Sequence, residues 1–503
     1  MVYYTVIEHM SHLEKYFAKY RNQIIGIDQK FDSPYGEQKI VYADWTASGR
    51  LYEPIEKKLR EEFYPLVGNT HTETNITGSS MTIAYHHALR IIKKHVNAGP
   101  NDLIISTGSG MTGVVNKFQR ILGLKVYEKH RKLINLPVEE RPLVFITHME
   151  HHSNQTTWLE TIADVEIINP DKNGQVDLAH FKELLAQYSY RKVKYAAVTS
   201  CSNVTGLITP YFEMAELIHA AGGYIFVDFA CSAPYIDINM HPEKEEQHLD
   251  AIYFSPHKFL GGPGTAGTLI FCKSLYNNTI PDNPGGGTVD WTNPWGKHKY
   301  LDDIEMREDG GTPSFLQTIK TALCVKLKEE LGTDKMIARE QEQLSVLWGG
   351  LKDIPNLHLL ASNQPNRLGV VSFYIADLHY NLGVRLLNDK FGIQVRGGCS
   401  CAGTYGHYLL HVDQDTSNKI TYAISHGDLS AKPGWIRLSI HPTMTDSEIA
   451  YLLASVNQLA EKFPEWAEDY QYSVSTNEYA FKKLDVANEL QAKITGLFEG
   501  KLV

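Results

Sequence analysis

Cysteine, basic charge and long apolar runs are all scarce in this sequence, and each shortage excludes a class of protein. Six cysteines in 503 residues are too few for a disulfide scaffold, so a reducing compartment, the cytoplasm, is the simplest expectation. Only Cys399 and Cys401 lie close together, and no second pair completes a zinc site, so no metal is expected. No run approaches the roughly 20 apolar residues of a membrane helix, and the N-terminus does not resemble a signal peptide.

The charge balance argues against nucleic acid and anionic membranes as partners, because the formal net charge is -10. Hydrophobic residues make up 43% of the chain and charged residues 21%, which allows a large core and is untypical of disorder. The length of 503 residues indicates more than one domain.

Short apolar runs recur from about residue 80 onward and alternate with stretches that predict helices. Examples are "DLIIST", "PLVFITH", "KYAAVTS", "YIFVDFA" and "DAIYFS". Buried parallel strands have this continuous apolar character, and the alternation predicts an α/β fold with a largely parallel sheet covered on both faces. The run "GTLIFCK" follows its neighbour after a Gly-rich loop alone, which is compatible with an antiparallel strand.

The pattern predicts a large domain over residues 36–315 and a smaller α+β domain over 316–503. Between about residues 275 and 315 the sequence is rich in Gly, Pro and Asn, which predicts loops, and a long helix is expected over roughly 314–331. Residues 1–35 form an N-terminal segment that we expect to pack with the small domain. Apolar residues from Phe481 to Leu497 recur every three or four positions, which predicts an extra C-terminal helix that packs on its own core or on a partner subunit.

Polar side chains follow five of the predicted strands at the point where each strand ends. They are Ser109–Met111, His148–His152, Cys201–Asn203, Asp228 and Ser255–Lys258. Open α/β sheets bind ligands at the carboxyl ends of their strands, so these residues are expected to share one site.

Asp228 and Lys258 together predict pyridoxal phosphate as the cofactor. Asp228 alone would more often be a turn residue or a helix N-cap. A lysine at the end of a buried strand is costly unless its nitrogen is bonded, and a Schiff base with the cofactor aldehyde satisfies it. An aspartate on the neighbouring strand would hold the pyridine nitrogen protonated.

The stretch "TGSGMTG" supports more than one interpretation. Gly108, Gly110 and Gly113 match G-x-G-x-x-G between a predicted strand and a predicted helix, and Glu128 follows Gly108 by 20 residues. This outline fits a dinucleotide site of a nicotinamide-dependent oxidoreductase, another phosphate site, or a purely structural turn. The Asp228 and Lys258 pair favours the phosphate of pyridoxal phosphate.

The motifs "THMEHHSN" and "RGGCSCAG" also have competing interpretations. The histidines could stack on a cofactor, bind a metal or form a solvated loop. Cys399 and Cys401 lie in a Gly-flanked segment that could carry a reactive thiol or form a tight turn. Arg396 and Arg437 are candidates for binding a substrate carboxylate through two hydrogen bonds each, although most arginines are surface charges.

With these motifs assembled, the chain resembles the class V aminotransferase family of fold-type I pyridoxal-phosphate enzymes, in its cysteine desulfurase and selenocysteine lyase branch. The resemblance covers roughly residues 40–440 and is carried by "YADWTASG", "HMEHHSN", "SCSNVTG", "VDFACSAP", "FSPHKFLGGPGTAG", "EDGGTPS", "RLGVVSF" and "VRGGCSCAG". It implies a large domain with a mostly parallel seven-stranded sheet between helices, like that of aspartate aminotransferase, and a small α+β domain.

The resemblance also implies roles for individual residues. Lys258 would carry the cofactor, Asp228 would pair with the pyridine nitrogen, and His151 would stack on the ring. The remaining cofactor contacts would come from Ser109, Gly110, Met111, Asn203, Cys231, Ser255, His257 and Thr288. Thr288 would act across a dimer interface. Arg396, Arg437 and His71 would bind the substrate, and Cys401 would be the nucleophilic thiol.

Three departures from the family pattern leave the substrate open. Cys231 stands where Gln or His is usual, Cys399 is an extra thiol, and the stretch 404–434 looks like an insertion. We therefore expect a cytoplasmic homodimer that removes sulfur from L-cysteine through a persulfide on Cys401 and releases alanine, with a possible sulfur-acceptor protein. Transamination, epimerisation, β-lyase or molybdenum-cofactor sulfurase chemistry, and a catalytically inactive scaffold, remain alternatives.

Overall fold

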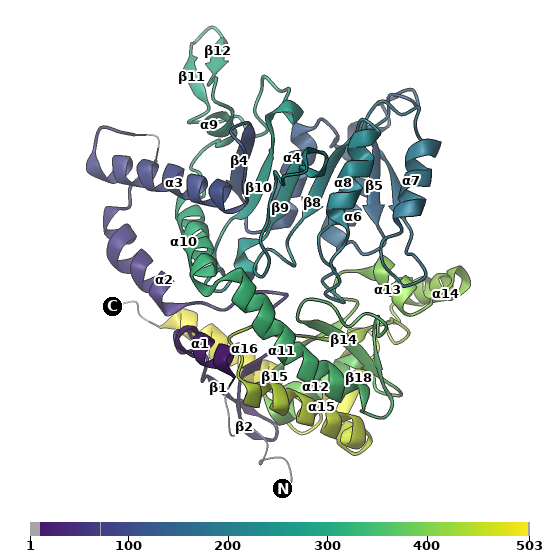
Figure 1. Ribbon diagram of the computed structural model, residues 1–503. Coiled ribbons are helices and arrows are strands. Elements are labelled where there is room, and N and C mark those ends of the chain that lie inside the picture. Colours follow the sequence, from purple (N-terminus) through teal and green to yellow (C-terminus); the bar gives the residue numbers. More distant parts are fainter. Residues whose placement is uncertain (1–10, 71, 501–503) are drawn as a thin grey trace. The chain divides into compact units, whose positions relative to one another are not determined.

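The structure is a computed structural model that describes residues 11–70 and 72–500 (Figure 1). The chain divides into a large unit, formed by Gln23–Ile25 and Thr46–Ile337, and a small unit, formed by the described residues up to Asn22, Gly26–Trp45 and those from Ala338 onward. The observed division falls inside α11 (Thr333–Lys352), whereas the sequence placed a boundary at residue 315.

The large unit is built on a seven-stranded sheet with the order β4-β10-β9-β8-β7-β5-β6. Its strands are β4 (Asp102–Thr107), β5 (Leu143–Thr147), β6 (Asp164–Ile168), β7 (Lys194–Thr199), β8 (Tyr224–Asp228), β9 (Ala251–Phe254) and β10 (Gly267–Cys272). The pairs from β9 to β6 are parallel, and β10 is antiparallel to both of its neighbours. The predicted mostly parallel seven-stranded sheet is confirmed, and β10 corresponds to the run "GTLIFCK".

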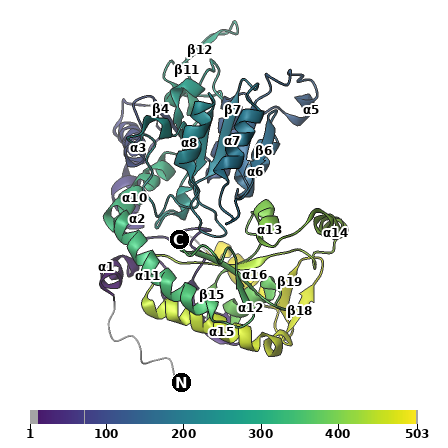
Figure 2. The ribbon, with the colours of Figure 1, turned by 45° about the vertical axis from the view of Figure 1, so that its right-hand side comes forward.

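Helices precede, connect and follow these strands along the chain, and several of them cover the sheet (Figures 1 and 2). They are α2 (Glu53–Lys58), α3 (Ile76–His95), α4 (Met111–Ile121), α5 (Glu128–Arg131), α6 (His152–Leu159), α7 (Leu178–Gln187), α8 (Tyr211–Ala220), α9 (Ile304–Glu308) and α10 (Phe315–Leu331). Shorter helical turns are η1 (Leu59–Phe63), η2 (Tyr64–Leu66), η3 (Glu245–Gln247), η4 (Pro256–Lys258) and η5 (Lys273–Leu275), and β11 (Val289–Thr292) pairs with β12 (His298–Tyr300).

The apolar core explains why the strands carry unbroken apolar runs. Phe226 of β8 packs edge-on against Phe118 of α4 and stacks with Trp158 of α6, so α4 and α6 share one face of the sheet. Both figures show α7 and α8 side by side, and α8 packs against β7 and β8. Because both faces are covered, every residue of β5, β7 and β9 is buried.

The small unit is an α+β structure around a four-stranded sheet with the order β13-β14-β17-β16. Its strands are β1 (Lys30–Ser33), β2 (Gly36–Lys39), β3 (Val41–Tyr42), β13 (Leu357–Leu359), β14 (Val370–Ile375), β15 (Ile393–Gln394), β16 (Arg396–Gly398), β17 (Trp435–Ser439), β18 (Tyr470–Ser473) and β19 (Glu478–Phe481). Its helices are α1 (His12–Arg21), α12 (Tyr380–Phe391), α13 (Gly403–Leu409), α14 (Gln414–Ser425), α15 (Asp446–Ala467) and α16 (Val486–Glu499).

The predicted C-terminal helix is present as α16, but it does not pack into a core of its own chain. None of its residues is buried, and Leu490, Leu497 and Phe498 are 58%, 74% and 86% exposed. The amphipathic pattern therefore located the helix; since none of its residues is buried, packing on a partner subunit is the expectation that stays a prediction. Among the described residues, no helix is both long and apolar enough to cross a membrane.

Candidate active site

The carboxyl ends of β4, β5, β7, β8 and β9 lie along one edge of the sheet, and the predicted cofactor residues follow them. Parallel pairing of the strands from β9 to β5 aligns four of these ends. β4 and β9 are both antiparallel to β10, which lies between them, so β4 runs in the same direction as β9. This edge is where open α/β sheets hold ligands.

Asp228 ends β8 in a buried position, and its side chain is oriented by the backbone. The Ala230 amide donates to its Oδ1 at 2.8 Å, and burial raises the pKa of Asp228 to about 6. The positive charge of Lys258 lowers this pKa in part, which places the two predicted partners within electrostatic reach of each other. Lys258 itself lies in η4, directly after β9.

Hydrogen-bond donors surround the start of α4. The Met111 amide donates to Ser255 Oγ at 2.8 Å, which joins α4 to the end of β9. A Cβ atom built on Gly110 would lie 3.4 Å from Ser255 Oγ and 3.9 Å from Nε2 of His257. The backbone at Gly110, the Ser255 hydroxyl and the His257 ring therefore face one small volume.

This donor set fits a phosphate. The turn before α4 needs a glycine at Gly108, where φ is +64°, and Ser109 beside it is exposed. A helix N-terminus carries partial positive charge, and an oxygen-rich dianion satisfies its amides. Burial, with the nearby Lys258 charge, lowers the pKa of His257 to about 4, so its ring is neutral and offers one N–H.

His151 caps α6 and is linked to α4. Its Nδ1 accepts a hydrogen bond of 3.1 Å from the Ser153 amide, and Ser153 Oγ lies 2.7 Å from Oγ1 of Thr112. His148 differs: it is fully buried, its Nε2 donates to the Gly174 carbonyl at 3.3 Å, and burial lowers its pKa to about 4. Of the three histidines in the motif, His148 is thus part of the core.

The loop after β7 is attached to Asp228 by its backbone. Ser200 donates from its amide and from its hydroxyl to the Asp228 carbonyl, both at 2.9 Å. Asn203 and Cys231 are 6% and 5% exposed, and Cys231 Sγ lies 3.7 Å from the Ser202 carbonyl. Both predicted neighbours of the cofactor ring are therefore buried, and Asn203 belongs to the loop that Ser200 attaches to Asp228.

Glu150 is a buried residue of this region that the sequence analysis missed. Its carboxyl group accepts from Thr147 Oγ1 at 2.6 Å, from the Thr199 amide at 2.9 Å and from Asn154 Nδ2 at 2.7 Å. Burial raises the pKa of Glu150 to about 8, and the Asp228 carboxylate acts in the same direction. A Glu and an Asn four residues apart at the start of a helix are the sequence signal that could have revealed it.

Thr288 and His71 are the two remaining predicted residues of the large unit. Thr288 is fully buried and its hydroxyl donates to the Gly285 carbonyl at 2.7 Å, within its own turn. His71 lies outside the described residues.

In the small unit, the two predicted arginines are cross-strand partners and share one carboxylate. Arg396 of β16 faces Arg437 of β17 in the antiparallel register. Asp44 Oδ1 lies 2.6 Å from Nη2 of Arg437, and Asp44 Oδ2 lies 3.4 Å from Nε of Arg396. Like charges that face each other across strands repel, so Asp44 offsets this repulsion.

Cys401 is in an exposed, strained turn that follows β16. Ser400 and Cys401 have φ values of +50° and +58°, a conformation that side chains other than glycine rarely adopt. Cys401 is exposed and Cys399 partly exposed, whereas Cys201, Cys231 and Cys324 are buried. The turn therefore presents one sulfur atom to solvent.

The sheet topology contradicts the interpretation of "GSGMTG" as a dinucleotide site. That site requires a strand, a helix and a neighbouring parallel strand. β4 is an edge strand, and its neighbour β10 is antiparallel to it. The glycines instead form the turn that leads into α4.

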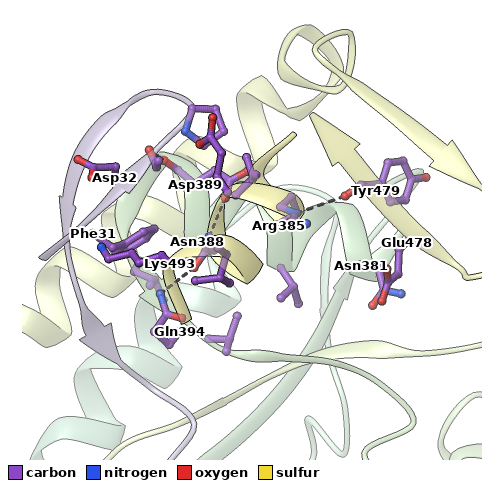
Figure 3. Close-up of a pocket in the computed structure, with 18 residues that line it drawn as sticks. Phe31, Asp32, Asn381, Arg385, Asn388, Asp389, Gln394, Glu478, Tyr479 and Lys493 are labelled. Atoms are coloured by element: carbon purple, nitrogen blue, oxygen red, sulfur yellow. Dashed lines mark hydrogen bonds between the residues drawn. The ribbon is translucent and has the colours of Figure 1, made fainter. Parts of the chain in front are cut away.

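A separate pocket of about 540 Å³ lies within the small unit (Figure 3). It is lined by residues from β1, α12, the β15 region, β19 and α16, among them Arg385, Asn388 and Lys493. None of the predicted site residues lines it, so it is distinct from the strand-end site.

Comparison with known proteins places this architecture in a family. The model of the family "Aminotransferase class-V" matches residues 41–452. Probable cysteine desulfurases of Staphylococcus aureus and Staphylococcus epidermidis are 26% and 28% identical, over 76% and 74% of this chain and 87% and 86% of theirs. A cysteine desulfurase structure from Thermococcus onnurineus superposes with a TM-score of 0.70 at 21% identity, over 88% of this chain and 98% of the other.

A second solved structure, a cysteine desulfurase from Escherichia coli, superposes with a TM-score of 0.67 at 20% identity, over 88% of this chain and 98% of the other. The chain belongs to the class V aminotransferase family, because the family model covers most of its length. It is therefore a pyridoxal-phosphate-dependent enzyme, as its strand ends predicted, and its donor set around Gly110 fits the phosphate of that cofactor.

Proposed function

We propose that this enzyme is a cysteine desulfurase that transfers sulfur from L-cysteine to Cys401. The observation that carries the proposal is that Cys401 is the exposed thiol among the six cysteines and lies in a strained turn next to glycines. The probable cysteine desulfurases among its relatives support the same reaction. Cytoplasmic location and a sulfur-acceptor protein remain predictions.

The cofactor, when bound, withdraws electrons from the substrate Cα and stores them in its ring. Lys258 would hold the aldehyde before substrate arrives and would then remove the Cα proton. Asp228 would keep the pyridine nitrogen protonated, and His151 would orient the ring. Gly110, Ser255 and His257 would hold the phosphate.

Cys401 would act as a thiolate on the substrate sulfur. A new S–S bond forms while the C–S bond of the substrate breaks, and its electron pair goes to carbon. Cys401 then carries a persulfide, the substrate carbon takes up a proton, and alanine leaves, so that atoms and electrons balance. Arg437 would bind the substrate carboxylate, and its present partner Asp44 would have to yield part of that contact.

The experiment measures alanine and enzyme-bound sulfane sulfur in a single turnover with L-cysteine. Cys401→Ser is expected to lose both, whereas Cys399→Ser and Cys272→Ser retain them. Unchanged alanine from Cys401→Ser would reject the persulfide role of this thiol. Formation of pyruvate in place of alanine would indicate β-lyase chemistry.

The family resemblance also leads us to propose a homodimer in which Thr288 contacts the cofactor phosphate of the second copy. In the described chain its hydroxyl is occupied by the Gly285 carbonyl, so dimer formation would have to redirect it. Light scattering of the purified protein gives the oligomeric state. If the mass is that of a monomer, this role for Thr288 fails.

A further inference from the structure

A second cluster of chemically active side chains lies in the large unit at the opposite end of β9 from Lys258. His219 near the end of α8, His248 after η3 and Asp250 just before β9 place their ligand atoms within 4.8 Å of one another. Nε2 of His219 is 2.9 Å from Asp250 Oδ2, and Nε2 of His248 is 3.4 Å from Asp250 Oδ1. The proposed reaction uses none of these residues.

The hydrogen bonds on the far side of each ring determine where its proton lies. Nδ1 of His219 is 2.8 Å from the Glu246 carbonyl, and Nδ1 of His248 is 2.8 Å from the Glu245 carbonyl. A carbonyl oxygen can only accept, so both Nδ1 atoms carry hydrogen. A ring without a second proton therefore directs the lone pair of Nε2 at the carboxylate of Asp250.

Three electron-rich groups that face one another need a positive charge between them. In the metal-free chain a proton on His248 supplies it, because the hydrogen bond to Asp250 raises the pKa of His248 to about 9. The two rings are stacked at 4.1 Å with an angle of 6°, so one ring has to rotate before both Nε2 lone pairs meet at one ion. One divalent cation bound by both Nε2 atoms and the carboxylate would replace that proton. Backbone carbonyls that hold Nδ1–H are also the usual outer partners of metal-bound histidines.

The cluster is held in place without a metal, which favours binding. Gln247 Nε2 donates to Oε1 of Glu216 on α8 at 2.5 Å, and Lys244 pairs with the same oxygen at 2.5 Å. The loop that carries His248 is thus attached to the helix that carries His219. The Ile225 amide donates to Asp250 Oδ2 at 2.8 Å and fixes the carboxylate, whose side chain is 4% exposed.

We propose that His219, His248 and Asp250 bind one divalent transition-metal ion, with Zn²⁺ as the probe. Two imidazoles and one carboxylate are a donor set that Zn²⁺ accepts, and water can supply a fourth ligand because the His248 side chain is 37% exposed. Tetrahedral zinc with bonds of about 2.0–2.2 Å separates its ligands by roughly 3.3–3.5 Å, so the contact of His219 with Asp250 opens by a few tenths of an ångström.

The role of this site is structural. A cation there ties α8, the η3 loop and the start of β9 together, at the edge of the sheet remote from the cofactor. Because the ion binds the folded chain, it raises the free energy of unfolding in proportion to the logarithm of its concentration above Kd. The metal takes no part in the sulfur reaction.

Zinc titration of the chelator-treated holoenzyme tests the proposal, by competition with a chromophoric chelator. The parent is expected to bind one equivalent more than His248→Ala and than His219→Ala, and to gain thermal stability on adding Zn²⁺ that both variants lack. His180→Ala, a histidine elsewhere in the large unit, should behave like the parent. Equal binding by the parent and both cluster variants would overturn the proposal.

Cobalt distinguishes this cluster from the thiols of Cys399 and Cys401, which also attract zinc. The Co²⁺-loaded parent should show a d–d spectrum without thiolate-to-metal charge transfer, and His248→Ala should lose that spectrum. If the only spectrum carries thiolate bands and vanishes in Cys401→Ser, the metal is on the cysteines and the proposal is wrong. The result is independent of whether the desulfurase proposal holds.

Discussion

Arg437 and Asp44 form a 2.6 Å ion pair inside the small unit, although 393 residues separate them along the chain. The Arg437 side chain is only 2% exposed, and Arg396 faces it across the strands. The residue proposed to bind the substrate carboxylate is therefore kept in place by a carboxylate of its own chain. Asp44 belongs to the motif "YADWTASG", so this motif supplies the carboxylate that pairs with Arg437.

The first prediction concerns Asp44→Asn. The substitution removes the charge with which Asp44 pairs the buried guanidinium of Arg437, opposite Arg396, so the free energy of unfolding should fall by about 3 kcal/mol. Denaturant titration of parent and variant measures it. Asp28→Asn, which removes the partner of Lys39 in an exposed pair, is the control and should cause no measurable change. Equal stability of parent and Asp44→Asn would show that the pair contributes nothing.

The second prediction concerns Asp228 and cofactor binding. Its pKa of about 6 means that the carboxylate is charged at pH 8 and mostly neutral at pH 5. A charged hydrogen bond is worth about 1.5–3 kcal/mol, so at pH 8 Asp228→Asn should bind the cofactor roughly tenfold to a hundredfold more weakly than the parent. Below pH 6 this ratio should shrink toward one, because the parent loses the same charge.

Fluorescence titration of the cofactor-free protein at several pH values gives these affinities. The comparison with the variant cancels the ionisation of the cofactor phosphate, which affects both proteins equally. Asp177→Asn is a matched control, since Asp177 caps α7 and asparagine caps a helix equally well. If the ratio of the two cofactor affinities does not change with pH, the Asp228 carboxylate does not interact with the cofactor nitrogen.

The third prediction is that Glu150→Gln changes how stability depends on pH. Burial raises the pKa of Glu150 to about 8, whereas a glutamate in an unfolded chain has a pKa of about 4.3, so between about pH 5 and pH 8 the folded parent holds a proton that the unfolded chain has released, and its stability falls as pH rises. Glutamine does not titrate, so the variant lacks this fall, although it also loses a hydrogen bond. The groups that reach the Glu150 carboxyl from Thr147, Thr199 and Asn154 are all donors. A glutamine would place its own N–H groups against Nδ2 of Asn154. The side-chain amide of Asn154 cannot flip to present its oxygen instead, because Oδ1 of Asn154 accepts a hydrogen bond of 2.6 Å from the Tyr253 hydroxyl.

Urea unfolding of parent and Glu150→Gln at several pH values from about 5 to 8 tests this prediction, and the stability of the variant relative to the parent should rise with pH. Glu160→Gln, at a position whose side chain is 64% exposed, is the control and should change stability by no more than about 0.5 kcal/mol. If the stability of Glu150→Gln relative to the parent does not change with pH, the folded state does not hold a proton on Glu150 and the prediction is wrong.

The sequence predicted the parts of this fold that depend on local patterns. Strands buried on both faces leave continuous apolar runs, so β5, β7 and β9 were evident, and the residues after them marked the site edge. The pairing of Asp44 with Arg437 depends on which distant strands are neighbours, and no local pattern records that. Of the donors around Glu150, Thr147 and Asn154 are near it in the sequence, whereas the Thr199 amide comes from a separate strand, and only that pairing has no local signal.

The fourth prediction uses Lys328 of α10, a lysine in the core of the large unit. Its Nζ donates to the Ile236 carbonyl and lies 3.2 Å from Nε2 of His95, and burial lowers its pKa to about 7. In the unfolded chain a lysine has a pKa of about 10.4. Between pH 7 and pH 10 the unfolded state therefore binds a proton that the folded state lacks, and stability contributed by this residue rises with pH.

Lys328→Met cannot titrate, so the stability of the parent relative to this variant should increase from pH 7 to pH 9, by at most about 1.4 kcal/mol per pH unit. Unfolding of both holoenzymes in the same buffers measures the difference, and any pH effect of the cofactor cancels. His95 does not interfere, because burial is the main cause that lowers its pKa to about 4, so its ring stays neutral from pH 7 to pH 9. Lys326→Met, at an exposed position on the same helix, is the control, and its stability should depend on pH in the same way as that of the parent. If the stability of Lys328→Met has the same pH dependence as that of the parent, Lys328 is charged in the folded enzyme, and the core must hold a counter-charge for it.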